Sequence, residues 1–314
     1  RGDPVDPVTG RGYTIPQTDL VLTGPLVFEI RRSYSSFDAA LDVGLGHGWT
    51  HSLAFSIEVR RRSMVVRTPH TGASLHDLPP AGGEITLGDG TVIVRDEEGF
   101  VATLSDGLVY LLEPSPSPSR HRLAAVVDRA GNRIDLEYEG EDLVSLRDSL
   151  GRLVRVRRSD ARRIASFELV TSRGRAVSYR SYEYDARGDL IATVDAEGRR
   201  VRHVYDDEHR LLEQAFPSGL TVFFQYDSEG RCTETWCACP GGTDPVLAPD
   251  VPALLADGQT KAKGLLHCKL DYYDGFTMVY DSRQGRRFHS NDRGRIDLAA
   301  GVWVERLAYD ERGR

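Results

Sequence analysis

Residues 184–230 read YDARGDLIATVDAEGRRVRHVYDDEHRLLEQAFPSGLTVFFQYDSEG. Within this stretch Asp185, Asp206 and Asp227 each begin a turn-like tetrapeptide, and they are spaced 21 residues apart. The first and last of these tetrapeptides end in glycine. A fixed spacing of turn signals indicates an internal repeat, which decides the fold before any other motif.

Each turn unit combines an aspartate with a glycine three residues later. Aspartate at the first position of a type I turn accepts hydrogen bonds from the backbone, and glycine at the fourth position tolerates the positive φ needed to re-enter a strand. The predicted structural turn residues are Asp128, Gly131, Asp148, Gly151, Asp185, Gly188, Asp195, Gly198, Asp227 and Gly230.

The segments between the turns are short and partly alternating, as in 199–205 (RRVRHVY) and 220–226 (LTVFFQY). Strands average about five to six residues, and no apolar period near 3.6 is sustained here. Strands joined by tight turns form hairpins. The sequence therefore predicts an all-β fold, an antiparallel strip of repeated hairpins that follows a β-rich N-terminal domain.

Composition shifts divide the chain. A Pro/Ser run separates strand-like but non-repetitive segments from the repeats, and a Pro/Gly/Ala-rich stretch interrupts the repeats later. The predicted parts are a β-rich N-terminal domain (1–113), a linker or loop (114–119), repeats (120–236), an irregular insertion (237–263) and further, truncated repeats (264–314). Because the chain stops inside a repeat, we expect a segment of a longer polypeptide.

These motifs resemble the YD repeat of the Rhs family. The matching segments are Tyr184-Asp185-x-x-Gly188-x-Leu190, Asp195-x-x-Gly198, Tyr226-Asp227-x-x-Gly230 and Tyr309-Asp310-x-x-Gly313. Upstream, Gly2-Asp3-Pro4-Val5, Arg32-Ser33-Tyr34-Ser35-Ser36 and Leu45-Gly46-His47-Gly48-Trp49 are similar to the domain that precedes these repeats. The resemblance covers nearly the whole chain except the insertion.

The resemblance implies a sheet that spirals into a hollow cocoon around a C-terminal toxin domain. It implies that the partners are the remainder of the same polypeptide, its toxin domain and secretion-spike proteins. The location it implies is the bacterial cytoplasm before delivery, and the outside of the cell afterwards. No segment matches the self-cleaving aspartates of the family, so no catalytic residue is carried over.

The four cysteines lie in one window, Cys232, Cys237, Cys239 and Cys268, beside His267. Thiolates with an imidazole would suit Zn²⁺, with Cys237, Cys239, His267 and Cys268 as ligands. However, one residue separates Cys237 from Cys239, whereas structural zinc sites have about two to four. A disulfide that closes the insertion and unbonded thiols are the other interpretations. We expect thiols, no metal and no cofactor.

Charge and motifs exclude several functions. With 40 basic and 47 acidic residues the formal charge is −7, which disfavours nucleic acid as a partner. No apolar run approaches the roughly 20 residues of a membrane span. Neither G-x-S-x-G nor H-E-x-x-H occurs. Gly44–Trp49 lacks the spacing of a phosphate loop and predicts a turn, and we expect no metal between His47 and His51.

A structural, non-enzymatic shell segment is therefore the leading hypothesis. One alternative is a binding module for carbohydrate or a partner protein at the cell surface, with Tyr272, Tyr273, Phe276 and Tyr280 exposed. A metalloenzyme that uses the cysteine and histidine cluster is another. Ring exposure and metal content distinguish the three.

Overall fold

The computed structural model describes residues 4–69, 72–239, 254–281, 285–290, 296–300 and 304–306. In this part of the chain every regular element is a β-strand, apart from one 3₁₀ turn, η1 (Ser36–Asp38). The predicted all-β class is confirmed. The described elements include no helix that is long and apolar enough to cross a membrane.

The N-terminal strands form a small antiparallel sheet of their own, in the order β1 (Gln17–Leu22), β2 (Phe28–Tyr34) and β3 (Trp49–His51). In β2 every second residue from Phe28 to Tyr34 is buried, because successive side chains of a strand point to opposite faces. One face of this sheet is therefore packed against the rest of the molecule.

The second sheet contains the remaining strands: β4 (Ser56–Val59), β5 (Ser63–Thr68), β6 (Gly72–Asp77), β7 (Glu84–Thr86), β8 (Val92–Arg95), β9 (Phe100–Thr103), β10 (Val109–Pro114), β11 (Arg120–Val127), β12 (Arg133–Glu139), β13 (Asp142–Asp148), β14 (Leu153–Arg158), β15 (Ile164–Val170), β16 (Ala176–Tyr184), β17 (Leu190–Asp195), β18 (Arg200–Tyr205), β19 (Leu211–Ala215), β20 (Thr221–Tyr226), β21 (Cys232–Ala238), β22 (Leu265–Tyr273), β23 (Phe276–Tyr280), β24 (Gly285–Ser290), β25 (Ile296–Ala300) and β26 (Val304–Arg306). From β7 onward each strand pairs antiparallel with the next one along the chain.

The strip branches at β11, which pairs with three other strands. Along one edge its residues Arg120–Arg122 pair with β4, and further along the same strand Ala125–Val127 pair with β12. Its other edge pairs with β10. The hairpins β4-β5-β6 therefore diverge from the repeat strip at this point.

A bulge recurs two residues after several turns. Tyr205 pairs with Leu211 and Val204 pairs with Glu213, so that Leu212 is an extra residue in β19. The same register shift occurs in four other strands, where the extra residue without a partner in the pairing is Val144, Ala165, Ile191 or Thr233. Bulges bend and twist the strand that carries them. In β19 the bulge interrupts the alternation of buried and less buried side chains, so that Leu211 and Gln214, three residues apart, are both buried.

The Pro/Ser run is a hairpin loop. Pro114 ends β10 and pairs with His121 of β11, and the N–H of Ser115 donates to the carbonyl of Arg120 at 2.8 Å. Residues 114–119 thus connect two strands that pair with each other. The two sheets divide between His51 and Ser56, and strands β4–β10 belong to the same sheet as the repeats.

The predicted insertion lies between β21 and β22, which pair with each other. Strand β21 extends to Ala238, one residue past the predicted start of the insertion at 237. Residues 240–253 lie outside the described part, but the segment that follows returns to the sheet, since Leu255 is buried and the N–H of Ala256 donates to the carbonyl of Asp281.

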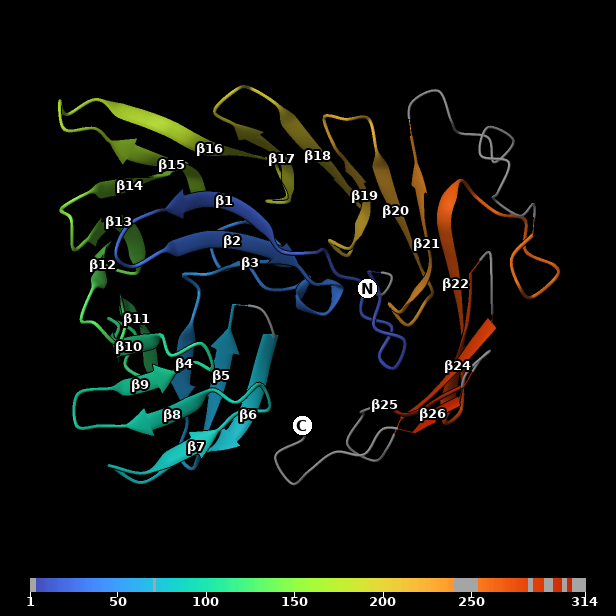
Figure 1. The fold of residues 1–314 in the computed structure, drawn as a ribbon, viewed down its shortest axis with the longest axis horizontal. Helices are drawn as coiled ribbons and strands as arrows, with labels where there is room; N and C mark the ends of the chain where they lie inside the picture. Colours follow the sequence, from blue (N-terminus) through green and yellow to red (C-terminus); the bar gives the residue numbers. More distant parts are fainter. Residues whose placement is uncertain are drawn as a thin grey trace.

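The strip curves around the N-terminal sheet (Figure 1). Large buried side chains from both sheets form one core, among them Trp49, Tyr34, Phe100 and Phe167. The face of the strip that packs on β1–β3 is called the inner face below, and the opposite face the outer face.

Candidate functional site: the repeat turn and the docked inner face

The turn at 227–231 shows the geometry of the repeat. The N–H of Gly230 donates to the carbonyl of Asp227 at 3.1 Å, and the N–H of Asp227 donates to the carbonyl of Arg231 at 2.9 Å. The Asp227 carboxylate oxygen Oδ1 accepts the N–H groups of Glu229 and Arg231, both at 2.9 Å. Gly230 has φ +79°, a conformation that favours glycine.

All ten predicted turn residues lie in turns with this arrangement. The carbonyl of each aspartate accepts the N–H of its glycine, and every one of these glycines has a positive φ. The turn at 206–210 has the same hydrogen bonds but carries His209, with φ +63°, in the position of the glycine.

An arginine at the fifth position closes the turn. The Nε groups of Arg152, Arg199, Arg210 and Arg231 donate to Oδ2 of the aspartate four residues earlier, at 2.6–2.9 Å. Burial alone would raise the pKa of Asp227, but the backbone and side-chain donors of Arg231 outweigh it and lower that pKa. Sequence reasoning missed this arginine, although Gly-Arg at 151–152, 198–199 and 230–231 signals it.

Tyrosines of the strip join successive hairpins. The hydroxyl of Tyr205 donates to the carbonyl of Leu190 at 2.8 Å, and that of Tyr272 donates to the carbonyl of Cys232 at 2.5 Å. Tyr138 and Tyr184 make equivalent bonds to Leu123 and Ile164. The Arg231 guanidinium lies 4.7 Å from the centroid of the Tyr272 ring, and Arg210 lies 5.3 Å from that of Tyr226. The arginine of one turn therefore covers a tyrosine of the next hairpin.

The N-terminal sheet docks on the inner face through buried polar groups. Arg32, 1% exposed, forms an ion pair with Asp19 and donates to Thr193 Oγ1 at 3.1 Å. The hydroxyl of Tyr182 donates to Asp19 Oδ2 at 2.6 Å. Breaking a buried pair of this kind leaves an uncompensated charge, so Arg32 fixes the position of β2 on the strip.

Aromatic side chains continue the docked surface. The indole N–H of Trp49 donates to the Tyr205 hydroxyl at 2.7 Å, and Trp49 also packs edge-on against His203 with 4.9 Å between centroids. Tyr34 donates to the carbonyl of His209 and accepts the N–H of Leu211, both at 2.9 Å. The motif Leu45–Trp49, recognised in the sequence, thus lies against the repeats.

The glycine-rich loop around His47 fits closely against the strip. The N–H of Ile164 donates to the carbonyl of Gly44 at 2.8 Å, and Asp42 pairs with Arg163 at 2.6 Å. A Cβ atom at Gly46 would come within 2.7 Å of the carbonyl oxygen of Gly188. Gly46 is therefore required because the loop approaches the backbone of another strand connection so closely that no side chain fits between them.

His47 and His51 have separate environments. His47 stacks on His209, whereas the Nε2 of His51 lies 3.3 Å from the carbonyl of Val43. Burial lowers the pKa of His51 to about 4 and that of His203 to about 3, so that both rings are neutral near pH 7.

In the cysteine window, His267 contacts a carboxylate and the backbone of a lysine. Glu234 Oε2 accepts from Lys263 Nζ and lies 3.4 Å from His267 Nε2, while the N–H of Lys263 donates to His267 Nδ1. Both ring nitrogens of His267 therefore have protein partners. Cys232 and Cys268 are buried, and Cys237 and Cys239 are half-buried. Among the described residues no group of three or more His, Cys, Asp or Glu side chains is placed to hold a metal ion.

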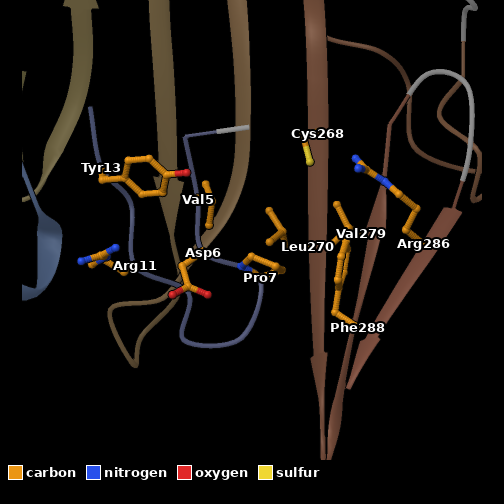
Figure 2. A pocket seen from close by; sticks show the side chains of 10 residues that line it. All are labelled: Val5, Asp6, Pro7, Arg11, Tyr13, Cys268, Leu270, Val279, Arg286 and Phe288. Carbon is orange, nitrogen blue, oxygen red and sulfur yellow. The ribbon is translucent and has the colours of Figure 1, made fainter. Parts of the chain in front are cut away.

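A pocket of about 450 Å³ lies where the N-terminal segment meets the inner face of strands β22–β24. Figure 2 shows Val5 and Pro7 facing Leu270, Val279 and Phe288 across it. Its lining also includes the charged side chains of Asp6, Arg11 and Arg286. The pocket is thus largely apolar and lies on the inner side of the strip.

Two family profiles match the chain. The RHS Repeat matches residues 184–221, and a domain of unknown function, DUF6531, matches residues 2–76. Toxin protein Tse5 of Pseudomonas aeruginosa is 25% identical over 272 residues, and the probable deoxyribonuclease RhsA of Dickeya dadantii is 29% identical over 245 residues. The chain belongs to the Rhs/YD-repeat family. The resemblance stated from the sequence is confirmed.

The Rhs chain covers only part of these relatives. The alignments span 72% and 71% of the Rhs chain but 20% and 16% of Tse5 and RhsA. Among solved structures, TcdB2-TccC3-Cdc42 aligns with 81% of the Rhs chain and 14% of its own length, at 10% identity and a TM-score of 0.42. TcdB2-TccC3 without its hypervariable C-terminal region aligns with 91% of the Rhs chain and 21% of its own length, at 10% identity and a TM-score of 0.38.

Proposed function

We propose that this Rhs chain is a non-catalytic wall segment of a hollow shell that encloses a C-terminal toxin domain for delivery to competing or host cells. The observation that carries the proposal is the arginine–tyrosine connection between successive hairpins. Each repeat is tied to its neighbours, so that repeats lengthen a wall without needing a closed core of their own. The names of the relatives, a toxin protein and a probable deoxyribonuclease, support a toxin as the content.

The chemistry of the described side chains supports containment. The turn carboxylates are bonded to backbone N–H groups and, in most turns, to an arginine of the same turn. Burial raises the pKa of the Cys232 thiol to about 12, which makes it a poor nucleophile. We accordingly assign no catalytic residue and no cofactor.

The proposed division into parts follows the sequence: a β-rich N-terminal domain (1–113), a linker or loop (114–119), repeats (120–236), an irregular insertion (237–263) and further repeats (264–314). The proposed partners are the remainder of the same polypeptide, its toxin domain and secretion-spike proteins. We propose that the protein is made in the bacterial cytoplasm and then secreted.

The test uses the native gene product. We expect its intact mass to exceed that of this chain, or a C-terminal piece to copurify with it, and that piece to resist protease. The double variant Arg210→Met/Arg231→Met should expose the piece to cleavage, because it loosens three hairpins. Arg202→Met, on an exposed side chain of the outer face, is the matched control. A soluble monomer of this chain alone, with no companion, would overturn the proposal.

A binding module remains the alternative, supported at one position. Tyr273 is 54% exposed and stacks on Phe276 with 4.9 Å between ring centroids. In contrast, Tyr272 donates to the carbonyl of Cys232 and is covered by Arg231. Glycan binding that is lost in Tyr273→Ala would favour this alternative.

A further inference from the structure

The β15–β16 hairpin extends past the strand that follows it. Strand β16 pairs with β15 as far as Ala176, but its pairing with β17 ends at Arg180, opposite Asp195. The tip of this hairpin lies at the upper left of Figure 1. Within the ranges that the structure describes, no strand pairs with residues 176–179 on the side of β17. This stretch, about 13 Å of strand, is called the free edge below.

The backbone of the free edge has hydrogen-bonding groups to offer. In the turn that joins β15 to β16, the N–H of Thr171 donates to the carbonyl of Arg175 at 2.8 Å, so these two residues face each other. In an antiparallel pair the N–H and C=O groups of successive residues point to alternate edges. The groups of Val177 therefore point to β15, whereas those of Ala176 and Ser178 point to the free edge.

An apolar row of the inner face also ends at the free edge. Val154 pairs with Leu169, and Leu169 pairs with Val177, so the three side chains lie side by side on one face. Val154 is 1% exposed, whereas Val177 at the end of the row is 38% exposed. A further strand at the free edge would continue this row and cover Val177.

The two ends of the free edge carry opposite charges. At the hairpin tip Arg173 and Arg175 are exposed, and no acidic side chain of the described residues pairs with either of them. At the other end lies the turn after β17, where Asp195 and Glu197 both bond to Arg199. Two carboxylates and one guanidinium leave that turn with one negative charge. The free edge therefore runs from a positive tip to a negative turn.

These features make the free edge complementary to itself. A two-fold axis places the same surface of two copies against each other. With the axis at Val177, Ala176 of each copy lies opposite Ser178 of the other, so that the outward-pointing backbone groups pair. Because the two strands are antiparallel, the positive tip of each copy reaches the negative turn of the other.

We propose that the free edge is a dimerisation surface, at which β16 of a second copy of this chain adds to β16 in antiparallel pairing. The turn after β17 stops the added strand at Arg180, so the interface is short. The dimer is therefore reversible and weakens as salt is added. This inference rests on the pairing of β15–β17 and applies whether or not the shell contains a toxin.

The experiment is sedimentation velocity of the 314-residue chain over a concentration series at low salt. Arg173→Glu/Arg175→Glu places like charges at both contacts between tip and turn, and Glu197→Arg does the same with the opposite sign. We expect each variant to raise the Kd of the dimer by at least about 10-fold. Arg61→Glu/Arg62→Glu, at the exposed tip of the β4–β5 hairpin, is the matched control and should leave the Kd unchanged.

Mixing the two charge variants tests the antiparallel arrangement. In the mixed dimer the negative tip of one variant meets the positive turn of the other, and the positive tip meets the negative turn. We expect an equimolar mixture to dimerise like the wild type, although each variant alone does not. A mixture that stays monomeric would overturn the proposal.

A proline tests the backbone pairing. Ser178→Pro removes an N–H that points to the free edge, where proline is tolerated in a strand, and it should abolish the dimer without changing the circular dichroism. A wild-type chain that is monomeric at every concentration would overturn the dimer, as would a dimer of equal stability in Ser178→Pro and in both charge variants. Should Ser178→Pro fail to fold, the mixed charge variants carry the comparison.

Discussion

Arg231 connects three parts of the molecule through one side chain. It closes its own turn on Asp227, covers the Tyr272 ring of a later strand, and lies in the turn whose next residue, Cys232, accepts the Tyr272 hydroxyl. The guanidinium is about one-third exposed, so solvent screens its ion pair. Its contribution therefore comes from the ring contact and the closed turn together.

Replacement of Arg231 by methionine tests this contribution. We expect Arg231→Met to lower the free energy of unfolding by about 1 kcal/mol, because one charge-assisted hydrogen bond and one cation–π contact are lost. Urea denaturation followed by circular dichroism gives the value. Arg202→Met should change it little, and an equal loss in both variants would contradict the role of the fifth position.

Turn glycines differ in what surrounds them. Gly198 has open space around it, whereas a Cβ at Gly188 would clash with the Arg163 guanidinium. We expect Gly198→Val to cost about 1–3 kcal/mol from positive φ alone, and Gly188→Val to cost more, because Arg163 must also leave Asp42. Thermal melts rank the two, and a Gly188→Val that is no less stable than wild type removes the turn assignment.

Acid should destabilise the fold through its buried histidines. Burial lowers the folded pKa of His203 to about 3 and that of His51 to about 4, against about 6.5 in the unfolded chain. Below pH 6.5 the unfolded state therefore binds more protons than the folded state. As the pH is lowered, the free energy of unfolding decreases by up to about 1.4 kcal/mol per pH unit for each histidine. In His203→Gln this slope should decrease by the contribution of one histidine. The free energy of unfolding from urea denaturation at several pH values between 4 and 7 gives the slope. An unchanged slope would contradict the assignment.

At the scale of elements, the sequence predicted the hairpin repeat because aspartate and glycine have strong local preferences in turns. The same reasoning placed the ten turn residues and the β-strands between them. It did not predict the bulged residues such as Leu212, because a bulge depends on how two strands pair. It did not predict the docking contacts either. Arg32 and Thr193 are 161 residues apart, and no local pattern joins them.

The loop at 114–119 offers a test of how the elements are connected. Because β10 and β11 pair on both sides of this loop, a cut between Pro116 and Ser117 should leave one folded body. We expect fragments 1–116 and 117–314, expressed together, to copurify and to melt in one transition. Two independently folded fragments would show that the run is a linker between domains.

At the scale of the whole molecule, the core of the strip is completed by side chains of the N-terminal sheet. Residues 120–236 alone would expose inner-face side chains such as Phe167, Leu190 and Leu211, which are fully buried in the chain. We expect this fragment to aggregate or to bind a hydrophobic dye, and residues 1–119 supplied in trans to restore solubility. A soluble fragment 120–236 with strand-type circular dichroism would show that the repeats need no covering.

The docked sheet also has a consequence during synthesis. Strands β1–β3 leave the ribosome before the strip, and the strip partners of Arg32 and Tyr34 follow 161 to 177 residues later. At about 5–20 residues per second, the apolar face of this sheet waits for about 10–30 s before the repeats reach it. A chaperone that binds exposed strands could bind this sheet during that interval. The hairpins of the strip would then fold against a sheet that has already formed.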